Sequence, residues 1–130
     1  MKTRNVERFK YKNYLTKAEE FYEATNDSYT HRRFNATVLN AVHCAISSAD
    51  ALTVFYKEQR HAGERHEDVV NLLNSLGLPD IQSKNRQLLA LLAIKNGAEY
   101  EDRIMSESEA ASAMKNAERF YKWVKDLLKT

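Results

Sequence analysis

The residues of this chain best suited to chemistry are Arg60 and His66, which stand with five residues between them. A histidine with an ordinary pKa of about 6.5 can exchange a proton with an RNA 2′-hydroxyl or a leaving oxygen. An arginine can hold a phosphate through two parallel hydrogen bonds and neutralise developing charge. The pair therefore fits the cleavage of RNA without a metal ion. The same spacing also fits a structural role, in which His66 packs or caps the start of a helix and Arg60 is a solvated helix end.

A second candidate is a polar stripe in a segment that is almost free of charge. Between Phe34 and Leu52 the only formal charge is Asp50. Residues at steps of three, four and three share one face of a helix, and the polar ones here are Asn40, His43, Ser47 and Asp50. The stripe predicts either a polar groove or interface, or a set of core polar groups satisfied by their neighbours. In both cases Asp50 needs a partner, and an arginine is the obvious one.

The charge of the chain is distributed unevenly. Residues 1–17 carry six Lys and Arg side chains against Glu7 alone, a net charge of +5, whereas the whole chain has a net charge of +2. Such a basic segment fits a contact with nucleic acid or a nucleotide, or else a solvated helix face.

Other kinds of site are excluded by composition and motif. Cys44 is the single cysteine, so there is no disulfide framework and no cysteine-rich zinc site, and we expect it to be a small buried hydrophobic residue. Glu58 and His61 form one Glu-x-x-His motif, but a di-iron bundle needs two. We therefore expect no metal and no cofactor. The lone cysteine and the lack of a stretch approaching about 18 apolar residues predict a cytoplasmic protein that does not interact with membranes.

Helices must position these residues. With 130 residues, three Gly and one Pro, the chain predicts an all-α domain over 1–130, an up-down bundle of four long helices plus one short helix. The expected helices span about 3–25, 31–59, 66–76, 80–96 and 107 onwards, with a loop at 60–65. Tyr14 and Phe21 belong to the apolar stripe of the first helix, and the second helix should be central because it has so few charges. Ser106 and Glu109 form a capping box at the start of the last helix.

This topology predicts where the cations meet. In an up-down bundle, the start of the first helix, the 60–65 loop and the 95–105 segment would lie at the same end. The side chains expected to gather there are Arg4, Arg8, Arg60, His61, Arg65, His66 and Lys95, with Tyr100 close by. We interpret Arg4, Arg8, Arg65, Lys95 and Tyr100 as candidate nucleotide- or RNA-binding residues.

Three stretches together resemble the HEPN family, the "higher eukaryotes and prokaryotes nucleotide-binding" helical domains. They are NAVHCAISSADAL at 40–52, RHAGERH at 60–66 followed by VVNLL at 69–73, and KNGAEY at 95–100 followed by SESEA at 106–110 and AERF at 117–120. The resemblance implies a bundle of four to five helices that is usually a homodimer. Many relatives are metal-independent ribonucleases of defence or toxin–antitoxin systems, often encoded beside a nucleotidyltransferase partner, and others only bind nucleotides or partners. Active members carry an arginine and a histidine four to six residues apart, as Arg60 and His66 are.

The chain departs from many active relatives, in which the pair lies late, just before a tyrosine. At that place this sequence has Lys95, Glu99 and Tyr100, with no histidine. We therefore expect a non-enzymatic module that binds a nucleotide, RNA or a protein partner. The alternatives are a metal-independent endoribonuclease that uses Arg60 and His66, and a structural subunit that dimerises through the helix at 31–59 or the last helix.

Overall fold

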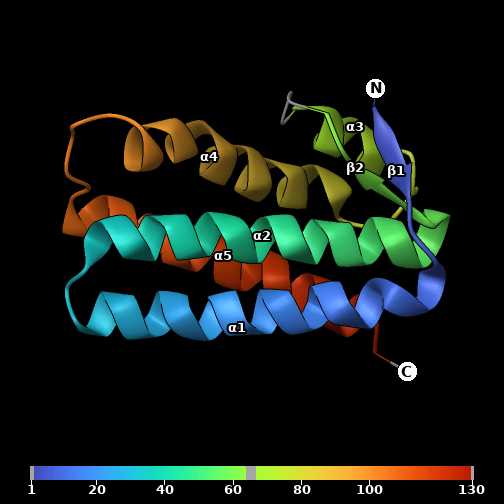
Figure 1. The fold of residues 1–130 in the computed structure, drawn as a ribbon, viewed down its shortest axis with the longest axis horizontal. Helices are drawn as coiled ribbons and strands as arrows, with labels where there is room; N and C mark the ends of the chain where they lie inside the picture. Colours follow the sequence, from blue (N-terminus) through green and yellow to red (C-terminus); the bar gives the residue numbers. More distant parts are fainter. Residues whose placement is uncertain (1, 64–66, 130) are drawn as a thin grey trace.

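The structure, a computed structural model, describes residues 2–63 and 67–129 and is an all-α bundle with one very small sheet (Figure 1). Its elements, in chain order, are β1 (Thr3–Asn5), the 3-10 turn η1 (Arg8–Lys10), α1 (Tyr11–Thr30), α2 (Phe34–Lys57), β2 (Gln59–His61), α3 (Glu67–Asn74), α4 (Ile81–Glu99) and α5 (Glu107–Leu127). The predicted fold class is confirmed.

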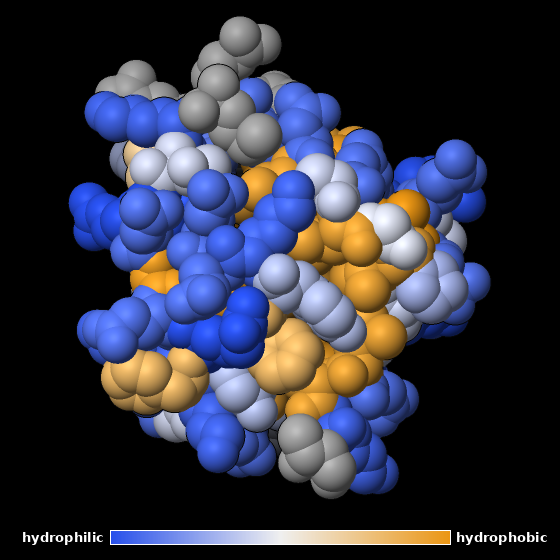
Figure 2. Space-filling model, turned by 90° about the vertical axis from the view of Figure 1, so that its right-hand side faces the viewer, coloured by the Kyte–Doolittle hydropathy of each residue, from blue (hydrophilic) through white to orange (hydrophobic). Residues whose placement is uncertain are grey.

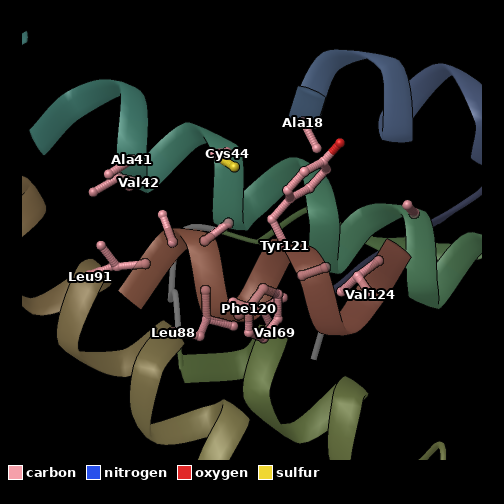
Figure 3. Packing of buried hydrophobic residues seen from close by; sticks show 14 of the residues in the cluster. Ala18, Ala41, Val42, Cys44, Val69, Leu88, Leu91, Phe120, Tyr121 and Val124 are labelled. Carbon is pink, nitrogen blue, oxygen red and sulfur yellow. The ribbon is translucent and has the colours of Figure 1, made fainter. Parts of the chain in front are cut away.

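The second helix is central, as its composition predicts. Helix α2 packs against α1, α4 and α5, and its three valines and the four alanines from Ala41 to Ala51 are fully buried. Figure 3 shows Val42 and Cys44 of α2 in the same core as Phe120 of α5 and Leu88 of α4. Burial raises the pKa of the Cys44 thiol to about 12, so this thiol is unreactive at neutral pH. By length and composition α2 could span a membrane, but 72% of its most apolar stretch is buried inside the bundle, as expected of a core helix.

The first predicted helix has the wrong limits at both ends. Residues 3–5 form β1 instead of helix, and α1 continues past Asn26-Asp27-Ser28 to Thr30. The Ser28 hydroxyl is satisfied within the helix, where it donates to the carbonyl oxygen of Ala24 at 2.7 Å. Arg32, with a left-handed φ of 59°, then reverses the chain.

The predicted 60–65 loop contains a strand. Helix α2 ends at Lys57, because Glu58 adopts a left-handed φ of 54°, and β2 then pairs antiparallel with β1. Hydrogen bonds flank the ladder on both sides, from Val6 N to the oxygen of Glu58 at 2.9 Å and from Ala62 N to the oxygen of Lys2 at 3.0 Å. Three residues are too few to show the alternation by which a strand is predicted.

Helix α3 does not cross the bundle, and this corrects the predicted topology. It stays at the end that holds β1 and β2, so α4 starts there and runs to the opposite end (Figure 1). The 95–105 segment therefore lies beside the turn between α1 and α2. Met105 N donates to Asn35 Oδ1 at 2.8 Å, and Arg32 forms an ion pair with Glu107 at 3.0 Å.

The capping box at the start of α5 is present as predicted. The Ser106 hydroxyl accepts from Glu109 N at 3.1 Å, and the Glu109 carboxylate accepts from Ser106 N at 2.9 Å. Arg103 adds two hydrogen bonds of 2.9 Å to the same carboxylate, and together these bonds lower the pKa of Glu109.

Candidate functional site

The site is organised around an ion pair between Asp50 and Arg60 at the β1–β2 end of the bundle. Asp50 is buried in α2, and the turn at Glu58 folds β2 back along α2. Arg60 Nε consequently lies 3.4 Å from Asp50 Oδ2, an ion pair without the alignment of a good hydrogen bond. The predicted arginine partner of Asp50 is thus confirmed.

Asp50 is an unusually basic carboxyl group. Burial raises its pKa from the ordinary 3.8 to about 6, and the positive charges of Arg60 and Lys17 offset part of that effect. The guanidinium of Arg60 also lies over the ring of Tyr14, 5.7 Å from its centroid. A carboxylate and an aromatic ring therefore fix the position of Arg60.

A pocket of about 260 Å³ lies on one side of this pair. Its polar lining comes from Arg4, Asp50, Arg60 and His61, and its apolar lining comes from α2, α3 and α4. Arg4 and Arg60 stand directly opposite each other in the β1–β2 ladder. Like charges at such a position repel, and Asp50 is the one carboxylate in the described lining. With two guanidinium groups and one carboxylate, the pocket is suited to an anion.

A groove of about 620 Å³ lies on the other side of the pair, between α1 and α2. The four residues of the polar stripe, Asn40, His43, Ser47 and Asp50, all line it. Lys17 and Glu20 add charges of both signs, while the ring of Phe21 lies 5.3 Å from that of His43. Each interpretation of the stripe is met in part: the four residues line a groove, while Ser47 and Asp50 are buried and Asp50 is paired with Arg60 of β2. Asp50 and Arg60 line both cavities and so connect them.

The surface at this end is mixed in character. Figure 2 views the molecule from this end and shows hydrophilic side chains beside a continuous apolar area. Arg8 is held there, because its Nε donates to the carbonyl oxygen of Phe55 at 2.7 Å and its guanidinium lies 3.5 Å from Glu58. Arg8 therefore fastens η1 to the end of α2 and faces neither cavity.

A comparison with protein families shows what kind of domain surrounds this site. The family model described as HEPN domain matches residues 11–127. The chain belongs to the HEPN family. A comparison with curated proteins found no match. The family match runs from the first residue of α1 to the last residue of α5, so β1, which supplies Arg4, lies outside it.

In this HEPN domain the predicted gathering of cations is realised only in part. Arg4, Arg60 and His61 line one pocket, whereas Arg65 and His66 lie outside the described residues. The pairing of Arg60 with His66 therefore stays a prediction.

The expectation that Lys95 and Tyr100 join this site was wrong. Both lie at the opposite end of the HEPN bundle, because α3 leaves α4 to start at the β1–β2 end (Figure 1). Lys95 forms an ion pair with Glu99 there and lies over the ring of Tyr100.

Sequence reasoning missed the contribution of α1 to the groove. Tyr14 and Phe21 lie on the predicted apolar stripe, yet both are only partly buried and line the groove. Their spacing carries no signal that one edge of the stripe is open, since this depends on how α1 is set against α2.

Proposed function

We propose that this HEPN domain is a binding module for a nucleotide or an RNA end, and that it holds a phosphate group between Arg4 and Arg60. The observation that carries the proposal is the direct opposition of these two arginines in the β1–β2 ladder, on the wall of one pocket. Like charges directly opposite each other destabilise a strand pair, and an anion bound between the two guanidinium groups would offset this repulsion.

The chemistry of the pocket fits a phosphate monoester. Two guanidinium groups offer paired N–H donors that match phosphate oxygens, and the His61 imidazole lines the same wall. A phosphate dianion bound between the two guanidinium groups would attract both of them, and this attraction would outweigh their mutual repulsion. Asp50 holds Arg60 in place before the ligand arrives, which lowers the entropic cost of binding.

The groove supplies what the rest of a nucleotide requires. It begins at Arg60, where the pocket ends, and it offers the rings of Tyr14 and Phe21 for stacking. The Asn40 amide and the Ser47 hydroxyl offer hydrogen bonds to a base or a ribose. The proposal therefore places the phosphate in the pocket and the nucleoside in the groove.

We expect Arg4→Ala to weaken binding of a 5′-phosphorylated oligoribonucleotide by about 10-fold or more, since a hydrogen bond to a charged group contributes about 1.5–3 kcal/mol. Arg4 is exposed on a three-residue strand, so its side chain can be removed without opening the core. Fluorescence anisotropy with the labelled oligonucleotide measures the effect. Arg119→Ala, which removes an exposed arginine from α5, is the matched control and should keep the affinity.

The same oligonucleotide without its 5′-phosphate separates this proposal from general attraction to cations. It should bind the native protein about as weakly as the phosphorylated form binds Arg4→Ala, and it should be insensitive to that substitution. Equal affinity for both oligonucleotides would contradict a phosphate site.

Metal-independent cleavage of RNA is the second candidate, and the fixed position of Arg60 favours it, because a catalytic arginine must be preorganised. The test is to incubate mixed-sequence RNA in EDTA with the native protein and, in parallel, with His66→Ala and Arg60→Lys, and to compare the cleavage. Cleavage by the native protein that is lost in both variants would identify it as a metal-independent ribonuclease. Binding without cleavage would support the module.

A further inference from the structure

The proposed phosphate site contains a carboxylate as well as its two arginines. Asp50 lies in the wall of the pocket with Arg4 and Arg60, and it is only 4% exposed. Its Oδ2 lies 3.4 Å from Nε of Arg60, so a phosphate bound by Arg60 has to share that guanidinium with the carboxylate. The pocket measures only about 260 Å³, which leaves little water to screen the two anions from each other.

The charges of the described lining balance a single negative charge. Arg4 and Arg60 contribute two positive charges and Asp50 contributes one negative charge, which leaves a net charge of +1 when His61 is neutral. A phosphodiester has one negative charge and is neutralised as it stands. A terminal phosphate monoester, with a second pKa of about 6, carries about two negative charges above pH 7. Its complex would therefore hold an uncompensated negative charge beside a buried carboxylate, and such a charge is costly.

Asp50 is well placed to remove this charge by taking up a proton. Burial already raises its pKa to about 6, and a dianion on the same arginine would raise that pKa further, because a nearby like charge disfavours the ionised form. The neutral carboxyl group would also change its role toward the ligand. It could donate a hydrogen bond to a phosphate oxygen, whereas the carboxylate can only accept one.

The other charged and titratable groups around Asp50 come from α1, α2, β1 and β2. Those that line the pocket or the groove are Arg4, Lys17, Glu20, His43, Arg60 and His61. Arginine and lysine side chains are cations at neutral pH and accept no proton. Glu20 and His43 line the groove only, and the described lining from α3 and α4 is apolar. Within the described lining of the pocket, His61 is therefore the one alternative proton acceptor.

We propose that Asp50 takes up one proton from solvent when a terminal phosphate monoester binds between Arg4 and Arg60, so that the site releases this ligand as the pH rises above neutral. The inference rests on the proposed phosphate site and adds a regulation to it. It also separates the two kinds of phosphate in an RNA. An internal phosphodiester needs no proton to be neutralised, so its binding should lack this pH dependence.

The affinity of the native protein for a 5′-phosphorylated oligoribonucleotide should fall by up to about 10-fold between pH 7 and pH 8, since the uptake of one proton corresponds to a tenfold change per pH unit. The phosphate is already a dianion in this range, so its own titration contributes little. In Asp50→Asn the affinity should be nearly constant with pH. Glu20→Gln, which removes a carboxyl group of the groove, is the matched control and should keep the native pH dependence. Anisotropy measures the slope, which is a better readout than the absolute affinity because asparagine also holds Arg60 less firmly.

Calorimetry at pH 7.5 in two buffers with different heats of ionisation counts the protons directly. The native protein and His61→Gln should each take up about one proton per bound phosphate, and Asp50→Asn should take up about none. The oligonucleotide with a 5′-hydroxyl should cause no uptake in any of them.

The outcomes separate this inference from the phosphate site on which it rests. Phosphate-dependent binding without proton uptake would overturn the inference and leave the phosphate site intact. Uptake that persists in Asp50→Asn and is lost in His61→Gln would assign the proton to His61 and overturn it as well. Equal binding of the two oligonucleotides would reject the phosphate site, and the inference with it.

Discussion

Replacing Asp50 with asparagine is expected to raise the free energy of unfolding at pH 7 by about 3 kcal/mol. Burial raises the pKa of this carboxyl group from 3.8 to about 6, so between about pH 4 and pH 6 the folded state binds more protons than the unfolded state. The unfolding free energy therefore falls as pH rises through this window. A shift of about two units corresponds to about 3 kcal/mol, all of it lost by pH 7. Asparagine has the shape of the neutral acid and cannot ionise.

The loss of the carboxylate in Asp50→Asn should not strongly destabilise the charge of Arg60, because Arg60 is not fully buried. The side chain of Arg60 is 31% exposed, so its charge keeps contact with water after the carboxylate is gone. Urea unfolding of the native protein and Asp50→Asn, measured at a series of pH values from 4 to 8, gives the comparison. The difference in unfolding free energy should be near zero at pH 4 and reach its full value by pH 7.

Glu109 provides an internal reference. The pKa of its carboxyl is lowered by hydrogen bonds, mainly from Ser106 N, so its contribution to stability increases with pH. It is present in both proteins and cancels in the difference. Parallel pH curves for the two proteins would mean that Asp50 is not the group that titrates.

Replacing Arg60 with leucine is expected to have the opposite effect, a loss of about 3–5 kcal/mol at pH 7, because it leaves Asp50 buried without a counter-charge. The loss should shrink toward pH 4, where the carboxyl group is protonated in the folded state and no buried charge is left without a partner. Phosphate-dependent binding should disappear at every pH, since one of the two arginines of the pocket is gone. Urea unfolding and anisotropy measure the two effects separately.

The double variant Asp50→Asn, Arg60→Leu decides whether the two residues act on each other. It should be about as stable as Asp50→Asn alone, and so more stable than the native protein, because no uncompensated charge is left, and it should not recover binding. Arg60→Lys keeps the charge but not the planar donor pair, so it should be more stable than Arg60→Leu and still bind weakly. If the change in unfolding free energy of the double variant equals the sum of the gain in Asp50→Asn and the loss in Arg60→Leu, a direct ion pair is contradicted.

The sequence by itself determined the features that depend on neighbours a few residues away. Helical spacing and the scarcity of Gly and Pro predicted the all-α class, and the lack of charge between Phe34 and Leu52 identified the central helix. The capping box at Ser106 follows from two residues three apart. The need of Asp50 for an arginine follows from the cost of burying a charge, whatever the fold.

Tertiary structure alone decided which residues share a site. The pairing of β1 with β2 joins segments more than fifty residues apart, and it sets Arg4 opposite Arg60. The short helix α3 turns back at Gly77, with its φ of 65°, and so Lys95 and Tyr100 come to lie at the far end of the bundle. The periodicity of a helix indicates which of its faces is buried. It carries no information about the end of the bundle at which the next helix begins, because the packing of α3 and α4 against α2 and α5 fixes that.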